Sequence, residues 1–184
     1  MRFPLSLDKP LPDAARSVVV QVLLGVFCRV FDVRGPAVAT LPANQALRAF
    51  REFSAACMEA ASVSSAFAQS RRAELETQAY RLGSRVRAAL APTDAELMPL
   101  VSWLYSAIDI TVVGSISGEL VFQRCSFSVR YTPELCAFMS AFDSGFVGGL
   151  CGGGALAFSE RITAGAPCCR ALYVGAHVEE GGGR

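Results

Sequence analysis

The spacing of hydrophobic residues changes at about residue 108, and this change constrains the fold more than any other feature of the chain. Before it, apolar side chains recur at helical intervals on one helix face, most clearly at Leu75, Ala79, Leu82, Val86 and Leu90. After it, short runs rich in β-branched and aromatic residues alternate with turns that contain glycine. A helical first part followed by a sheet-containing second part predicts the α+β class, with N-terminal helices packed on a small antiparallel sheet.

The helical part predicts four helices, at about 13–33, 44–61, 65–91 and from 93 onward. Asp13 is expected to cap the first helix, and Thr93 with Glu96 has the spacing of a capping box for the fourth. Residues 1–12 contain three prolines, which predict an extended arm before the first helix.

The second part predicts two hairpins on either side of one helix. Strands are expected at about 110–114, 119–127, 155–163 and 168–174, and the helix at about 132–150. We therefore expect one α+β domain over 13–176, helical over 13–107 and sheet-containing over 108–176, with a disordered tail at 177–184.

Composition limits the partners of this chain. Hydrophobic residues make up 52% of its 184 residues and charged residues only 18%, which implies a large core, an apolar pocket or an interface between copies. A homodimer through the apolar first and second helices is one predicted arrangement. The 17 basic residues are scattered among 16 acidic ones, so no nucleic-acid partner is expected.

The sequence does not predict a membrane segment. The apolar run 18–31 is shorter than the roughly 20 residues of a spanning helix, and it contains Gln21 and Arg29. The longer run 135–158 contains Asp143 and several glycines, and the charged, proline-containing start of the chain does not match a secretory signal. We expect a cytoplasmic protein with no membrane partner.

Seven cysteines are present, an odd number that indicates reduced thiols in a chain without a secretory signal. Cys28 and Cys57 lie within apolar helical patterns and are expected to pack as small hydrophobic side chains. No Cys-x-x-Cys pair occurs, and the single histidine, His177, lies in a glycine-rich tail, so neither a metal nor another cofactor is expected. The other five cysteines follow residue 124 and place the candidate chemistry in the last third of the chain.

Residues in this last third resemble a known family. The similarity rests on Cys125, the run Pro133-Glu134-Leu135, Asp143, Arg161 and the motif Ile162-Thr-x-Gly165-x-x-Cys168-Cys169. This arrangement resembles the L-2-amino-thiazoline-4-carboxylic acid hydrolase family, with Phe142 where that family commonly has a cysteine.

A looser pattern resembles a second family, the 4-vinyl-reductase-type small-molecule-binding domains, whose fold is shared by trafficking-complex subunits. It comprises Leu82-Gly83, Leu135-Cys136, Phe146 to Gly149, and a terminal hairpin with Gly165 and Cys169. Both resemblances imply helices packed on an antiparallel sheet.

The hydrolase resemblance implies water addition to a cyclic amidine and opening of its ring by C–N bond cleavage. Asp143 would be the base, and Cys169 or Cys125 the nucleophile, provided that a cation lowers the thiol pKa. Arg161 would pair with the substrate carboxylate, and Cys136 and Phe142 would line the substrate site.

Each of these roles has a structural alternative. Asp143 can pair with an arginine, the cysteines can simply pack, and Arg161 can form a surface ion pair. Because its sequence signature is the tighter of the two, the hydrolase resemblance favours a small hydrolase of a cyclic amidine or thiazoline-type molecule. The alternatives are a module that binds an apolar small molecule and a subunit that makes protein contacts. A buried Asp143 with a reactive thiol favours the first, an apolar cavity the second, and a broad apolar surface the third.

Overall fold

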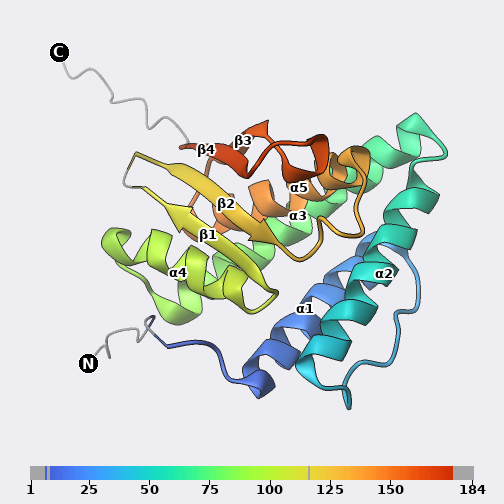
Figure 1. The fold of residues 1–184 in the computed structure, drawn as a ribbon, viewed down its shortest axis with the longest axis horizontal. Helices are drawn as coiled ribbons and strands as arrows, with labels where there is room; N and C mark the ends of the chain where they lie inside the picture. Colours follow the sequence, from blue (N-terminus) through green and yellow to red (C-terminus); the bar gives the residue numbers. More distant parts are fainter. Residues whose placement is uncertain (1–6, 8, 116, 176–184) are drawn as a thin grey trace.

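The computed structural model describes residues 7, 9–115 and 117–175. Over these residues the chain forms five α-helices, four strands and a short 3-10 turn (Figure 1). The elements in chain order are α1 (Asp13–Phe31), α2 (Ala43–Ala61), α3 (Ser65–Leu90), α4 (Asp94–Ser106), β1 (Ile110–Gly114), β2 (Glu119–Cys125), α5 (Pro133–Cys151), β3 (Ala155–Glu160), η1 (Ile162–Ala164) and β4 (Cys169–Val174). The predicted α+β class is confirmed.

The start of α1 differs from the prediction. Pro12 occupies the cap position and no side chain caps the helix, so the prediction that Asp13 is the cap is wrong. Asp13 is instead the first helical residue, where its charge complements the helix dipole and lies 3.5 Å from Arg16. At α4 the predicted capping box is present, and the backbone N–H of Thr93 donates to Oε2 of Glu96 at 2.8 Å.

The four strands form one antiparallel sheet in the order β1-β2-β4-β3. The two hairpins meet where β2 pairs with β4, with Phe122 opposite Cys169 and Leu120 opposite Ala171. These four side chains are buried under the helices, whereas Val113 and Leu172 lie exposed on the other face.

The strand predicted at 155–163 ends at Glu160, because the chain turns into η1. Gly165 closes this turn with a φ of 92°, a left-handed conformation that favours glycine. The backbone N–H of Ile162 donates to the Cys169 thiol sulfur at 3.2 Å, so the two chain segments stay close without a strand ladder.

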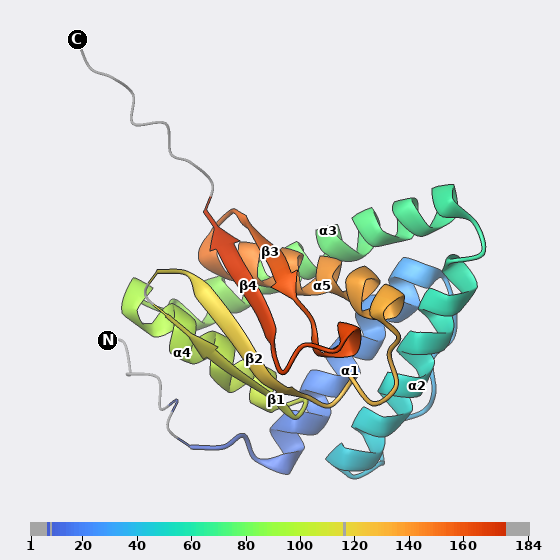
Figure 2. The ribbon, with the colours of Figure 1, turned by 45° about the horizontal axis from the view of Figure 1, so that its top comes forward.

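Helix α5 lies against β3 of the sheet, and α3 packs along α5 (Figures 1 and 2). Three glycines allow this close approach. A Cβ at Gly145 would overlap the carbonyl oxygen of Glu76, one at Gly149 that of Tyr80, and one at Gly83 that of Phe146. The glycines of the apolar run 135–158 therefore serve helix packing as well as chain turning.

Helix α1 packs against α2 and α3, and a single hydrophobic core cluster joins these helices to the sheet. Among the described residues, α1 is the one helix long and apolar enough to cross a membrane by length and composition. Core helices pass the same test, so this is weak evidence. The absence of a membrane segment therefore stays a prediction.

Part of the predicted domain organisation lies outside the described residues. These are residues 1–6 and 8 of the arm, and residue 176 with the tail 177–184, which includes His177. The rest of the arm, at 7 and 9–12, precedes α1 without forming a helix or strand.

Candidate functional site

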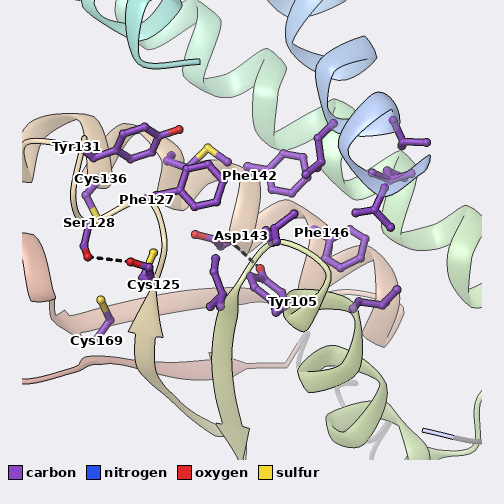
Figure 3. Close-up of a pocket in the computed structure, with 18 of the residues that line it drawn as sticks. Tyr105, Cys125, Phe127, Ser128, Tyr131, Cys136, Phe142, Asp143, Phe146 and Cys169 are labelled. Atoms are coloured by element: carbon purple, nitrogen blue, oxygen red, sulfur yellow. Dashed lines mark hydrogen bonds between the residues drawn. The ribbon is translucent and has the colours of Figure 1, made fainter. Parts of the chain in front are cut away.

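A cavity of about 230 Å³ lies between the end of the sheet and helices α1, α3, α4 and α5 (Figure 3). Most of its wall consists of apolar side chains, among them Leu23, Val86, Ile110, Met139 and Phe146. The loop after β2 adds Phe127 and Tyr131, whose hydroxyl is hydrogen-bonded to Ser54 at 2.7 Å. Such a wall provides contact area for an apolar molecule and few groups that would orient a polar one.

Among the described residues that line the cavity, Asp143 is the one with a carboxyl group. It points into the cavity from α5, and the hydroxyl of Tyr105 on α4 donates to its Oδ1 at 2.8 Å (Figure 3). Protein atoms surround the carboxyl, and the surface that it retains faces the cavity. Burial raises the pKa of Asp143 to about 6, although the hydrogen bond from Tyr105 and the charge of Arg161 act to lower it. Both protonation states of Asp143 are therefore populated near neutral pH.

Three thiols line the sheet end of the cavity, from Cys125 on β2, Cys136 on α5 and Cys169 on β4 (Figure 3). Burial raises the pKa of all three, and that of Cys125 reaches about 12. The nearby Asp143 adds to the rise at each of them, and Arg161 offsets only part of it at Cys136 and Cys169. These cysteines are therefore protonated near neutral pH, which does not suit an activated nucleophile.

Arg161 is not among the residues that line the cavity. Its guanidinium lies 5.0 Å from the centre of the Phe158 ring, and it donates to Oγ of Ser140 at 3.3 Å. Phe142 does line the cavity, and it stacks on Phe146 with 6.0 Å between ring centres. Six residues were selected from the sequence as candidates for the site. Five of them line the cavity, and Arg161 is the exception.

The remaining cysteines lie elsewhere. Cys28 and Cys57 are half-buried and pack against the hydrophobic core, and burial raises the pKa of Cys57 to about 11. Cys151 and Cys168 are half-buried and do not line the cavity. Within the described ranges, no group of three or more histidine, cysteine, aspartate or glutamate side chains is placed to hold a metal ion.

Tyr105 is the polar residue in contact with Asp143, and sequence reasoning missed it. It stands in the apolar pattern of α4, where an aromatic residue is expected simply to fill the core. A buried tyrosine hydroxyl needs a hydrogen-bond partner, and this requirement is the one signal that points from Tyr105 to a polar group such as Asp143.

The fold and the site define a small α+β protein with an apolar cavity that contains one carboxyl group. Comparisons with protein-family models, with curated proteins and with solved structures found no match for this chain. The resemblances to the thiazoline hydrolases and to the 4-vinyl-reductase-type domains therefore stay predictions.

Proposed function

We propose that this protein reversibly binds a predominantly apolar small molecule in the cavity between α5 and the sheet. The observation that carries this proposal is the wall itself, in which apolar side chains from four helices and the sheet surround a single carboxyl group. With about 30 Å³ for each water-sized group in a liquid, a volume of about 230 Å³ holds roughly eight such groups. An eight-carbon chain is therefore a suitable probe.

Asp143 gives this binding a pH dependence. An apolar ligand displaces water from the cavity beside the carboxyl, which makes the ionised form more costly. Ligand binding should thus raise the pKa of Asp143 above about 6 and take up a proton. Affinity for an uncharged ligand should increase as the pH falls through this range.

The binding proposal can be tested with 1-octanol and a variant that fills the cavity. Val86 lines the cavity, and Val86→Phe would occupy part of its volume, whereas Val113 is 51% exposed on the sheet and Val113→Phe is the matched control. We expect 1-octanol to raise the melting temperature of the wild type and of Val113→Phe, but not that of Val86→Phe. An equal rise in all three proteins, or none in the wild type, would contradict the proposal.

Ring-opening hydrolysis is a second candidate, because a carboxyl with a pKa of about 6 suits a general base near neutral pH. In this form of the proposal Asp143 activates water directly, and the protonated cysteines line the site without attacking the substrate. The test is the mass of 2-amino-thiazoline-4-carboxylate after incubation with the protein. Addition of one water at a rate proportional to protein, lost in Asp143→Asn, would support hydrolysis, and an unchanged substrate would exclude this reaction.

The partners and the location of the protein stay predictions. A homodimer through α1 and α2, a protein-interaction role and a cytoplasmic location are compatible with the proposal, but it does not depend on them. The 4-vinyl-reductase-like form of the fold would also place a small-molecule ligand among helices packed on a sheet, which agrees with the proposed binding.

A further inference from the structure

A second hollow lies next to the cavity, in a groove between α1 and α3 of about 440 Å³. Val18, Val22 and Leu82 line both the groove and the cavity, so the two spaces adjoin. Val18 and Val22 are 57% and 40% exposed, although they form part of an apolar wall. We call this adjoining groove the mouth of the cavity.

Three arginines surround this mouth, Arg29 from α1 and Arg81 and Arg85 from α3. They look scattered in the sequence, but the packing of α1 against α3 gathers them in one groove. The other polar residues that line the groove are Gln21 and Gln78, so none of the described residues in its wall is acidic.

The three arginines also differ from three paired arginines elsewhere on the surface. Arg16, Arg130 and Arg170 each pair with carboxylates, at distances between 2.6 and 3.6 Å. Within the part of the chain that the structure describes, Arg29, Arg81 and Arg85 form no ion pair or hydrogen bond. The mouth therefore carries positive charge without a counterion from this part of the protein.

We infer that the ligand is an anionic amphiphile, with its apolar body in the cavity and a single carboxylate at the mouth beside Arg29, Arg81 and Arg85. This inference rests on the proposed binding function and adds the charge and direction of the ligand. Arginine guanidinium groups bind carboxylates through charge-assisted hydrogen bonds. The exposed valines lie between the two spaces, where the ligand changes from apolar to charged.

The test compares three probes with the same chain and different head groups, octanoate, 1-octanol and octylammonium, by calorimetric titration at pH 8. We expect octanoate to bind about ten-fold more tightly than 1-octanol, and octylammonium to bind more weakly than either. Added salt should weaken the binding of octanoate and leave that of 1-octanol nearly unchanged, because salt screens exposed charges.

The variant that tests the mouth is the triple substitution Arg29→Gln, Arg81→Gln and Arg85→Gln. It should reduce octanoate affinity to that of 1-octanol, and its unchanged affinity for 1-octanol would show that the cavity is intact. The control is Arg48→Gln, an exposed arginine on α2 that lines neither space, and it should bind octanoate as the wild type does. If the triple variant does not fold, Arg85→Gln alone should weaken octanoate binding and its salt dependence.

The outcomes separate the two proposals. Binding of 1-octanol with no preference for octanoate, or an octanoate preference that survives the triple substitution, would overturn the anionic ligand and leave the apolar cavity in place. Failure of all three probes to bind would overturn both. An equal loss of affinity for octanoate and 1-octanol in the triple variant would show that the arginines support the structure of the cavity, which also overturns the inference.

Discussion

The hydroxyl of Tyr105 donates a hydrogen bond of 2.8 Å to Oδ1 of Asp143, and the contact joins α4 to α5 in the wall of the cavity. Each group provides the partner that the other needs in an apolar setting. Within the described residues the second oxygen of the carboxyl accepts no hydrogen bond, and the surface that Asp143 retains faces the cavity. The proton affinity of Asp143 therefore depends on its burial, on Tyr105 and Arg161, and on whatever occupies the cavity.

Removal of this hydrogen bond should change the acidity of the carboxyl. We expect Tyr105→Phe to raise the pKa of Asp143 above about 6, because the hydroxyl stabilises the ionised form. Carboxyl-carbon NMR titration would measure this shift. Tyr131→Phe removes another hydroxyl from the same wall, one bonded to Ser54, and should leave the pKa of Asp143 nearly unchanged. A pKa that stays the same or falls in Tyr105→Phe would refute the assignment.

Substitution of Asp143 should change how stability depends on pH. The folded-state pKa is raised to about 6 from an ordinary value of about 3.9, so the folded protein binds the proton more tightly. The wild type is thus penalised progressively as the pH rises from about 4 to 6, by up to about 3 kcal/mol. Asp143→Asn, which can still accept from Tyr105, should be the more stable protein at pH 8 and lose that advantage toward pH 4. Urea denaturation of both proteins across this range gives the difference, and an advantage that grows toward low pH would contradict the argument.

The thiols of the cavity should react slowly. Because the pKa of Cys125 is about 12, its thiolate fraction at pH 8 is small, and we expect alkylation by iodoacetamide more than about 100-fold slower than at the same residue in the unfolded protein. Mass spectrometry of timed samples would measure the rate at each cysteine. Equally rapid alkylation in the folded protein would show an activated thiol and restore the nucleophile hypothesis for Cys125.

Helix packing at the glycines should tolerate no side chain. Gly149→Ala places a Cβ against the carbonyl oxygen of Tyr80, and we expect it to destabilise the protein by more than about 3 kcal/mol, since backbone atoms must move. Gly25→Ala is the control, because the nearest atom to its Cβ is a flexible guanidinium nitrogen of Arg29 at 3.7 Å. That variant should gain about 0.5 to 1 kcal/mol from helix propensity. Similar unfolding free energies for the two variants would contradict the close approach of α3 and α5.

The helical stripe illustrates how far the sequence predicts the fold. Leu75 and Ala79 are fully buried as expected, whereas Leu82 and Val86 are half-buried because they line the cavity. Hydrophobic spacing identifies the inward face of a helix, but it does not distinguish a packed core from a ligand cavity, since both need apolar side chains. The prediction that Asp13 caps α1 is wrong for a local reason, because Pro12 already occupies the cap position.

The candidate site was partly predictable for a related reason. Residues alternate along β4, so Cys169 and Ala171 share its buried face, and Asp143 lies on α5, which packs against β3. Tyr105 and the arginines of the mouth come from helices far away in the sequence, so only the packing of those helices reveals them. Apolar patterns report burial, while contacts between distant polar residues depend on the complete topology.

The most direct test of the apolar cavity is intermolecular NMR between 1-octanol and methyl-labelled protein. We predict nuclear Overhauser effects from the octanol chain to the methyl groups of Val86, Ile110 and Met139, which line the cavity. Val63 and Val129, at 89% and 83% exposed, should show none. Effects confined to exposed methyl groups, or none at saturating 1-octanol, would contradict the claim that this cavity binds apolar small molecules.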